Sequence, residues 1–133
     1  MPTVLFADDE LDKIEGLIEI VKSEGYTVLT CCDASSAVRL ATTRQIDCIV
    51  IDVMMDPGSD LGGDPQVAGL AAIDAILKQR PKQGIICCSV IGDQTIVKQL
   101  KRRGVLYLKK GEMTADGAFR MIEAKATGRY KTQ

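Results

Sequence analysis

Short apolar runs alternate along the chain with longer segments whose apolar residues recur three or four positions apart. The apolar runs, each typical of a buried β-strand, lie at 3–7, 26–32, 46–52, 84–90 and 105–110. The segments between them predict helices with one buried face, and these begin near Leu11, Asp33, Val67, Asp93 and Thr114. Asp33, Asp93 and Thr114 are residue types that cap helix N-termini, whereas Gly25 and Gly104 stand where helices commonly end.

The repeated alternation of strand and helix predicts the fold class. It is typical of a parallel sheet that is covered by helices on both faces. Right-handed crossovers leave few topologies, of which the flavodoxin-like strand order 2-1-3-4-5 is the commonest at this length. We therefore expect an α/β protein, a doubly wound five-stranded parallel sheet with about five helices. Residues 1–133 are expected to form a single domain with a short C-terminal tail.

One segment interrupts this regular pattern after the third strand. The sequence DPGSDLGGDPQ at 56–66 is rich in glycine, proline and aspartate, which is typical of a loop. We expect an extended loop at 56–66. A tolerated surface insertion and a lid or partner-binding loop are both open as its role.

Composition excludes several kinds of function. The chain contains no histidine, which removes histidine triads, histidine general bases and most catalytic zinc sites. No apolar run approaches the ~20 residues that a membrane span needs, and the N-terminus lacks the pattern of a signal peptide, so a cytoplasmic protein is expected. The five cysteines form no CxxC pair and are interpreted as reduced thiols of the core.

The charge is distributed unevenly, although the formal net charge is only −1. Residues 1–65 hold 13 of the 18 acids and 4 of the 17 bases, hence a charge of −9, and the remainder carries +8. The basic run KQLKRRG at 98–104 belongs to the fourth predicted helix. A solvated helix face and a docking face for an acidic protein are both compatible with it. Nucleic-acid binding is disfavoured because no reading element or interleaved aromatic residue accompanies the run.

Polar residues follow four of the predicted strands. Asp8 and Asp9 come after the first strand and Asp52 ends the third; Ser89 and Lys110 stand at the ends of the fourth and fifth. In such a sheet functional groups gather beyond the carboxyl ends of the strands, so these side chains are expected to converge.

Three carboxylates, a hydroxyl and an ammonium suit phosphoryl transfer. Close carboxylates repel one another unless a cation offsets them, and Mg²⁺ is held by one or two carboxylates together with water and phosphate oxygens. A carboxylate can also attack phosphorus to give an aspartyl phosphate. We interpret Asp52 as this nucleophile, with Lys110 and the Ser89 hydroxyl binding the phosphoryl oxygens.

These residues resemble the response-regulator receiver domain over essentially the whole chain. The resemblance is carried by FADDE at 6–10, VIDVMM at 50–55, CSV at 88–90 and YLKKG at 107–111. It implies that Asp52 is the phosphoacceptor and that Asp8 and Asp9 bind the metal, Asp9 directly and Asp8 through water. It further implies that the backbone carbonyl of Met54 completes the metal shell. Ser89 is the matching switch hydroxyl and Tyr107 the matching switch aromatic residue.

The choice of lysine combines the resemblance with strand geometry. Family members read Tyr-Leu-x-Lys, which matches Lys110, and alternation along a strand sends Lys109 and Lys110 to opposite faces, so that only one can enter the site.

A departure from the family concerns Met54, Val90 and Ile91, which are apolar and cannot position a water molecule against a phosphoryl group. We expect a long-lived aspartyl phosphate for this reason.

The resemblance implies a signalling switch rather than an enzyme with a separate substrate. A sensor histidine kinase, a phosphotransfer protein or a small phosphodonor would modify Asp52 with Mg²⁺ as cofactor. The surface formed by the fourth predicted helix, the fifth strand and the fifth helix would then change its affinity for a downstream protein. A homodimer is compatible with this scheme, and a membrane partner is not expected.

Two alternatives stay open. The chain could be a docking module of the same fold that no longer accepts phosphate, which the segment at 56–66 and Val90 suggest. A haloacid-dehalogenase-like phosphatase also uses an aspartate nucleophile and Mg²⁺, but its general acid two residues after the nucleophile is replaced here by Met54. A flavodoxin-like nucleotide binder is disfavoured because the acids after the first strand would repel a phosphate.

Overall fold

The computed structural model describes residues 1–61, 63–90 and 93–128. Ile91, part of the segment at 56–66 (residue 62) and the end of the expected C-terminal tail (residues 129–133) therefore lie outside the described residues.

The core of the molecule is a parallel sheet of five strands in the order β2-β1-β3-β4-β5, which confirms the predicted topology. The strands are β1 (Thr3–Ala7), β2 (Thr27–Cys31), β3 (Cys48–Ile51), β4 (Ile85–Ser89) and β5 (Leu106–Lys109). Each is contained in one of the predicted apolar runs. The candidate site residues Asp8, Asp52, Ser89 and Lys110 each end a strand or directly follow one. The carboxyl edge of the sheet therefore carries the candidate site.

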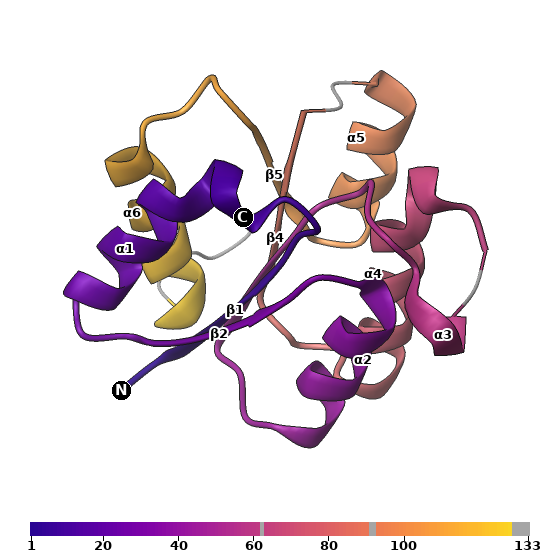
Figure 1. Cartoon of the computed structure of the whole chain (residues 1–133), viewed down its shortest axis with the longest axis horizontal. Helices are drawn as coiled ribbons and strands as arrows, with labels where there is room; N and C mark the ends of the chain where they lie inside the picture. The colour runs from indigo at the N-terminus through magenta and orange to yellow at the C-terminus, as the bar shows by residue number, and fades with distance from the viewer. Residues whose placement is uncertain (62, 91–92, 129–133) are drawn as a thin grey trace.

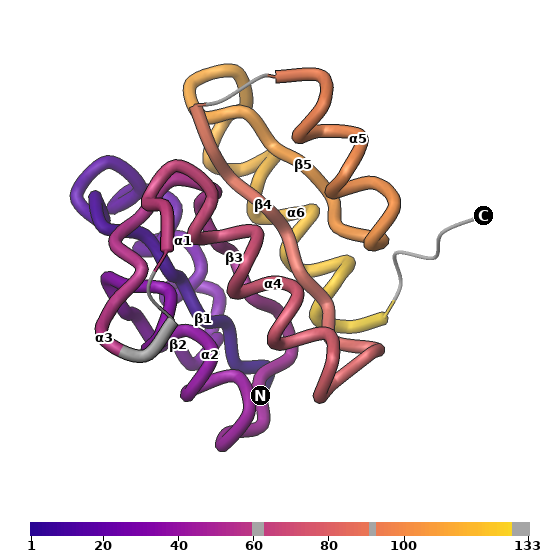
Figure 2. Tube along the Cα trace, turned by 90° about the vertical axis from the view of Figure 1, so that its right-hand side faces the viewer, coloured from indigo at the N-terminus to yellow at the C-terminus, as the bar shows by residue number. Residues whose placement is uncertain are grey.

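Helices cover both faces of this sheet (Figures 1 and 2). One face is covered by α1 (Glu15–Ser23), which follows the 3₁₀ turn η1 (Leu11–Ile14), and by α6 (Ala115–Ala126). The other face is covered by α2 (Ala34–Thr43), α4 (Ala68–Gln79) and α5 (Gln94–Arg102). Figure 1 separates the two groups, with α1 and α6 on the left and α2, α4 and α5 on the right. The five predicted helices are therefore present.

Two hydrophobic clusters hold the layers together. Successive strand residues point to opposite faces. In β3, Ile49 and Ile51 pack under α2 and α4, whereas Cys48 and Val50 pack under α1 and α6. All four side chains are buried, which explains the uninterrupted apolar run.

The edge strands are less buried than the central ones. In β2, Val28 and Leu29 are only half-buried, whereas every residue of β3 and β4 is buried.

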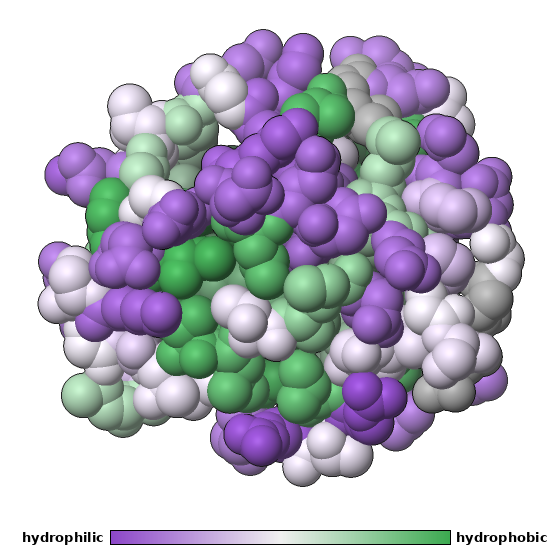
Figure 3. Space-filling model, in the orientation of Figure 1, coloured by the Kyte–Doolittle hydropathy of each residue, from purple (hydrophilic) through white to green (hydrophobic). Residues whose placement is uncertain are grey.

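Hydrophobic residues gather in the middle of the face shown in Figure 3, with hydrophilic residues around them. No helix in the described part of the chain combines the length and apolarity needed to cross a membrane.

The predicted helix boundaries rest on identifiable hydrogen bonds. The side chains of Asp33, Asp93 and Thr114 each accept a hydrogen bond from a backbone N–H two or three residues further on. Gly25 and Gly104 have φ of +90° and +73°, and the amides around them close Schellman motifs at the ends of α1 and α5. These capping predictions are confirmed.

The segment at 56–66 is not a plain loop, contrary to the reading of its composition. It contains the short helix α3 (Gly58–Leu61) and begins the 3₁₀ turn η2 (Pro65–Val67). Asp64 caps η2 by accepting a hydrogen bond from the Gln66 amide, and Pro65 occupies the first turn, where its missing N–H costs nothing. The same turn-forming residues that predicted a loop thus nucleate short helical turns.

This segment is attached to the beginning of α2. The Asp56 carbonyl accepts a hydrogen bond from the Ala34 amide (2.8 Å), and the Pro57 carbonyl accepts from the amide of Ser35 (3.0 Å) and from its hydroxyl (2.7 Å). Two of the four N–H groups that a helix leaves without internal partners are therefore satisfied by the segment. An isolated parallel bridge joins Asp33 and Asp56 at the same place.

Four of the five cysteines are buried, and all are free thiols. Burial raises the pKa of Cys31 and Cys48 to about 12. Thiols with such pKa values stay protonated and poorly nucleophilic near neutral pH. Cys32 differs from the prediction because its side chain is exposed.

Candidate functional site

Strand register brings the acids of β1 and β3 together. Ala7 pairs with Ile51, and the Asp52 amide donates a hydrogen bond to the Ala7 carbonyl (3.1 Å). Asp8 and Asp52, the next residue in each strand direction, consequently lie side by side at the carboxyl edge of the sheet. Both side chains are buried, with 2% and 5% of each residue exposed. Two carboxylates this deeply buried require a compensating cation.

Lys110 supplies that cation. Its Nζ lies 2.6 Å from Asp8 Oδ2 and 2.8 Å from Asp52 Oδ2, and only 10% of its side chain is exposed. Lys109 points elsewhere: its side chain is exposed, and its Nζ lies 3.5 Å from Glu112 Oε1. The strand alternation argument therefore identifies the lysine that enters the site.

Each carboxylate also receives a backbone hydrogen bond. Asp8 Oδ1 accepts from the Glu10 amide (2.9 Å), and Asp52 Oδ1 accepts from the Met54 amide (3.2 Å). One oxygen of each acid is thus held by Lys110 and the other by an N–H two residues further along the chain. The site is organised before any ligand arrives.

The electrostatics of the site follow from burial and pairing. Burial raises the pKa of Asp8 above its ordinary value, and the hydrogen bond from Lys110 only partly offsets this effect. Burial works against the charged form of Lys110, but its hydrogen bonds to Asp52 and Asp8 outweigh it and raise the pKa of the lysine. Two carboxylates and one ammonium leave an excess of negative charge, which favours a further cation at this place.

Ser89 and Tyr107 lie next to this triad. Ser89 is fully buried at the end of β4, and its carbonyl accepts a hydrogen bond from the Lys110 amide (2.8 Å). The Tyr107 hydroxyl donates to the same carbonyl at 3.5 Å. The Tyr107 ring is half-buried, and this burial raises the pKa of its hydroxyl. One backbone carbonyl therefore connects the lysine of the site with the predicted switch aromatic residue.

The donor set for Mg²⁺ is only partly gathered. Asp9 is exposed at the rim, unlike Asp8 and Asp52, and the Met54 backbone lies beside Asp52 through the amide hydrogen bond. Within the described residues, no three acidic, cysteine or histidine side chains are grouped closely enough to form a metal site by themselves. The donors are nevertheless all hard oxygens beside an excess of negative charge, which fits Mg²⁺ bound with water and phosphate oxygens.

Two apolar residues that follow the buried polar residues of the site are accessible to solvent. Met54 and Val90 follow Asp52 and Ser89 in the sequence, and they are 36% and 59% exposed. The third apolar residue of the sequence argument, Ile91, is outside the described residues.

Sequence reasoning missed one residue that supports the site. Gly69 is the second residue of α4, and its amide donates to the Val53 carbonyl (2.8 Å). A Cβ atom here would overlap the Asp52 carbonyl oxygen and lie 2.7 Å from Val53 Cα. A glycine inside an otherwise helical pattern was the available signal, since it often marks a close backbone contact.

Comparison with known proteins agrees with this geometry. The family model described as response regulator receiver domain matches residues 4–117. Among curated proteins, the nitrogen assimilation regulatory protein NtrX of Azorhizobium caulinodans is 31% identical over 109 residues, which are 80% of this chain and 22% of that protein. The chain thus spans about a fifth of that relative.

Solved structures share the fold. A CheY-like response regulator receiver domain protein from Methanospirillum hungatei has a TM-score of 0.80 at 15% identity, covering 97% of this chain and 96% of that one. A response regulator protein from Burkholderia pseudomallei, with a phosphorylated aspartic acid, calcium ion and citrate, has a TM-score of 0.73 at 19% identity, covering 97% of this chain and 71% of that one. At these identities the likeness shows the fold alone.

Proposed function

Because this chain belongs to the family of response regulator receiver domains, we propose that it is a signalling switch controlled by phosphorylation of Asp52. The observation that carries the proposal is the buried pair of Asp8 and Asp52 held by one ammonium, with Lys110 Nζ at 2.8 Å from Asp52 Oδ2. A purely structural ion pair would need one carboxylate. The second one leaves negative charge that suits a metal and a phosphoryl group.

The proposed reaction is the transfer of a phosphoryl group to the Asp52 carboxylate. A carboxylate oxygen forms a bond to phosphorus, the bond from phosphorus to the donor breaks, and the leaving group keeps that electron pair. A histidine leaving group takes up a proton, whereas acetate leaves as the carboxylate. The donor is a phosphohistidine of a sensor kinase or phosphotransfer protein, or a small phosphodonor. Lys110 and the Ser89 hydroxyl bind the oxygens of the transferred group and stabilise its charge.

Mg²⁺ is the proposed cofactor. Asp8, Asp9 and Asp52 would hold it together with the backbone carbonyl of Met54, Asp9 directly and Asp8 through water. When bound, the ion supplies positive charge that offsets the phosphoryl oxygens. The burial of Asp8, which raises the pKa of its carboxyl, is a cost that such a cation would relieve.

Phosphorylation is proposed to reach the surface through Ser89. A phosphoryl group on Asp52 attracts the Ser89 hydroxyl and Lys110. The backbone carbonyl of Ser89 accepts hydrogen bonds from the Lys110 amide and from the Tyr107 hydroxyl, so a shift of either residue is passed to Tyr107. Movement of Tyr107 then alters the surface formed by α5, β5 and α6, and with it the affinity for a downstream protein. The only chemistry proposed is transfer to and from Asp52 itself.

The test is the intact mass of the protein after incubation with acetyl phosphate, with and without Mg²⁺. Wild type should gain one phosphoryl group in the presence of Mg²⁺, and Asp52→Asn should gain none. Asp116→Asn, which changes an exposed aspartate in α6, is the matched control and should behave like wild type.

Two results would contradict the proposal. An adduct on Asp52→Asn would place the reacting group elsewhere. No adduct on wild type, with acetyl phosphate or with a panel of histidine kinases, would favour the phosphorylation-independent docking module. A phosphatase is disfavoured because Met54 offers no general acid two residues after Asp52.

A further inference from the structure

The N-terminus of α2 is joined to the short segment that follows Asp52. The Pro57 carbonyl accepts hydrogen bonds from the Ser35 hydroxyl (2.7 Å) and from the Ser35 amide (3.0 Å). The Asp56 carbonyl accepts a hydrogen bond from the Ala34 amide (2.8 Å). The helix α3, which continues the segment, lies beside α2 (Figures 1 and 2). Three hydrogen bonds therefore connect α2 with the residues that follow the proposed phosphoacceptor.

Ser35 is a buried polar residue in an apolar part of α2. Only 5% of it is exposed, and the nearby Ala34 and Ala37 are fully buried. A buried hydroxyl costs free energy unless it forms a hydrogen bond, so alanine would suit this position better if no partner were present. The Pro57 carbonyl, 22 residues further along the chain, accepts that hydrogen bond. The Ser35 side chain therefore joins two segments that are distant in the sequence.

The two segments approach each other closely at this place. Gly58 has a φ of +82°, and a Cβ atom there would lie 2.7 Å from Ser35 Oγ and 2.6 Å from Asp33 Oδ1. An isolated parallel bridge also joins Asp33 and Asp56. Atoms packed this tightly cannot shift independently of one another. A displacement of the N-terminus of α2 is therefore passed to the segment after Asp52.

The segment at 53–57, called the phosphoacceptor loop below, carries one of the proposed metal ligands. That ligand is the backbone carbonyl of Met54, and the amide of the same residue donates to Asp52 Oδ1 (3.2 Å). The next amide along the loop, that of Met55, donates to the Pro65 carbonyl (3.2 Å). The last two carbonyls of the loop are the ones that α2 holds. The backbone around Met54 is thus fixed by contacts with other segments.

A backbone ligand makes such contacts important for a metal. Mg²⁺ requires near-octahedral geometry with ligands at about 2.0–2.1 Å, so a small displacement of one ligand lowers the affinity. A carbonyl cannot adjust by rotating a side chain, because its place depends on the conformation of the loop that carries it. Groups that hold a ligand from outside the metal shell typically change the metal affinity by about 10–100-fold when they are replaced.

We propose that Ser35 is a positioning residue of the phosphorylation site, which holds the phosphoacceptor loop in the conformation that binds Mg²⁺. Ser35 is not one of the proposed metal ligands and acts through the Pro57 carbonyl. The inference rests on the proposed function, because the metal shell belongs to that function. It couples the N-terminus of α2 to the occupancy of the metal site.

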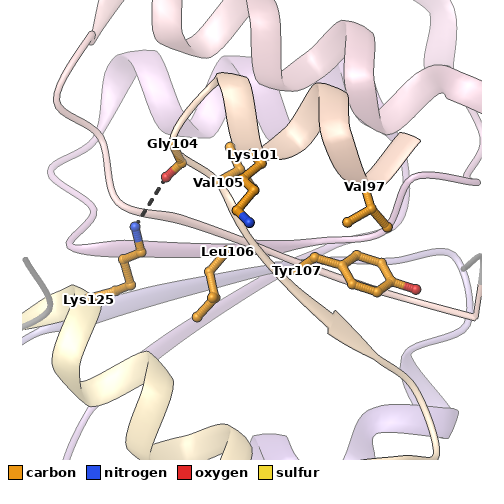
Figure 4. A pocket seen from close by; sticks show the side chains of 7 residues that line it. All are labelled: Val97, Lys101, Gly104, Val105, Leu106, Tyr107 and Lys125. Carbon is orange, nitrogen blue, oxygen red and sulfur yellow. Dashed lines mark hydrogen bonds between the residues drawn. The ribbon is translucent and has the colours of Figure 1, made fainter. Parts of the chain in front are cut away.

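This coupling leaves the site in a different direction from the proposed switch. The switch runs through Ser89 to Tyr107, whose ring lies next to Val97 of α5 (Figure 4). Tyr107 belongs to β5 at one edge of the sheet, whereas α2 follows β2 at the other edge. By thermodynamic reciprocity, Mg²⁺ then stabilises the N-terminus of α2 by as much as that N-terminus favours the binding of Mg²⁺.

The test measures the dissociation constant of MgCl₂ by isothermal titration calorimetry for wild type, Ser35→Ala and Ser36→Ala, with urea unfolding of each protein in EDTA. Ser36→Ala is the matched control, because the Ser36 hydroxyl donates to Asp33 Oδ2 (3.0 Å) at the same end of α2. We expect both variants to lose stability. Only Ser35→Ala should also bind Mg²⁺ more weakly, by about fivefold, which corresponds to the loss of one hydrogen bond.

Hydrogen exchange followed by NMR provides a second measurement of the coupling. Mg²⁺ should slow the exchange of the Ala34 and Ser35 amides in wild type, and it should slow that of Ala34 less in Ser35→Ala. The Gly104 amide, which donates to the Lys101 carbonyl (3.0 Å) shortly before β5 begins, is the reference and should not respond.

The outcomes separate this inference from the proposed function. Equal Mg²⁺ affinity of wild type and Ser35→Ala would overturn the inference, and Ser35 would then only stabilise the fold. An equal loss of affinity in Ser36→Ala would overturn it as well, because general loosening of α2 would explain both. If wild type gains a phosphoryl group with Mg²⁺ in either case, the proposed function stands. Wild type that binds no Mg²⁺ would contradict the proposed cofactor and the inference together.

Discussion

Gly69 of α4 lies against the backbone of Asp52, so closely that a Cβ atom at position 69 would overlap the Asp52 carbonyl oxygen. The Gly69 amide donates to the neighbouring Val53 carbonyl at 2.8 Å. The N-terminal turn of α4 therefore fixes the end of β3 from which the Asp52 side chain projects. A glycine is required here for close approach rather than for a special φ, since Gly69 is not among the glycines with positive φ.

Gly69→Ala should consequently destabilise the fold and impair phosphorylation together. Overpacking of a well-packed core costs about 1–3 kcal/mol, and here the colliding atoms are backbone, which cannot rotate away. We expect a loss at the upper end of this range in urea unfolding, with a slower gain of mass from acetyl phosphate.

Gly16→Ala is the matched control for this substitution. Gly16 is also the second residue of its helix, α1, but nothing lies within 4 Å of a Cβ built there. Because alanine favours helix more than glycine, this variant should gain up to about 1 kcal/mol. Equal unfolding midpoints for the two variants would show that the contact between α4 and β3 is not tight.

Much of the site could be predicted from the sequence because its parts follow from strand ends. An apolar run that stops at an acid locates a carboxyl edge, and the strand order then brings Asp8, Asp52 and Lys110 together. The choice of Lys110 over Lys109 needed only the two-residue period of a strand. Each of these inferences uses only a short stretch of sequence, and the strand order alone relates the stretches to one another in space.

Contacts between distant backbone segments could not be predicted in this way. The overlap at Gly69 depends on how closely α4 approaches β3, and the capping of α2 by the carbonyls of Asp56 and Pro57 depends on where an inserted segment happens to run. Composition described that segment as a loop because glycine, proline and aspartate start short helical turns as readily as they form loops.

Gly58 tests whether the inserted segment stabilises α2. Its φ is +82°, and a Cβ atom would lie 2.6 Å from Asp33 Oδ1 and 2.7 Å from Ser35 Oγ. Gly58→Ala should therefore combine backbone strain with a collision at the N-terminus of α2, and we expect a loss of about 2–3 kcal/mol in urea unfolding.

Gly63→Ala separates the two contributions. Gly63 has a similar φ of +89°, but nothing lies within 4 Å of its Cβ position, so only the backbone strain of about 1 kcal/mol is expected. If Gly58→Ala and Gly63→Ala lose the same stability, the contact with Asp33 and Ser35 contributes nothing.

The buried carboxyl of Asp8 predicts a pH dependence of stability. Burial raises the pKa of Asp8 above its ordinary value of 3.8, so the folded state binds the proton more tightly than the unfolded state. Between 3.8 and the raised folded pKa, the free energy of unfolding then falls as pH increases. Asp8→Asn lacks this titration.

The measurement is urea unfolding of wild type and Asp8→Asn at a series of pH values in EDTA. The stability of the variant relative to wild type should rise from acidic pH through this window and level off above it. Asp116→Asn, an exposed change in α6, provides the reference for a surface aspartate. A difference between Asp8→Asn and wild type that stays constant over the whole series would contradict the raised pKa.

The lifetime of the proposed aspartyl phosphate should be long because Met54, two residues after Asp52, and Val90, directly after Ser89, are apolar. Met54 and Val90 are exposed beside the site, and neither can accept a proton from a water molecule that attacks phosphorus. General-base assistance is typically worth 10²–10⁴-fold in rate. Met54→Glu should supply part of it and shorten the lifetime by at least about tenfold.

Decay of the mass adduct after removal of the phosphodonor measures this lifetime. Met113→Glu makes the same chemical change at another exposed methionine, in the connection between β5 and α6, and should leave the decay unchanged. A wild-type adduct that disappears within seconds would show that water reaches phosphorus without help from a side chain. In that case the apolar residues after Asp52 and Ser89 would not set the duration of the signal.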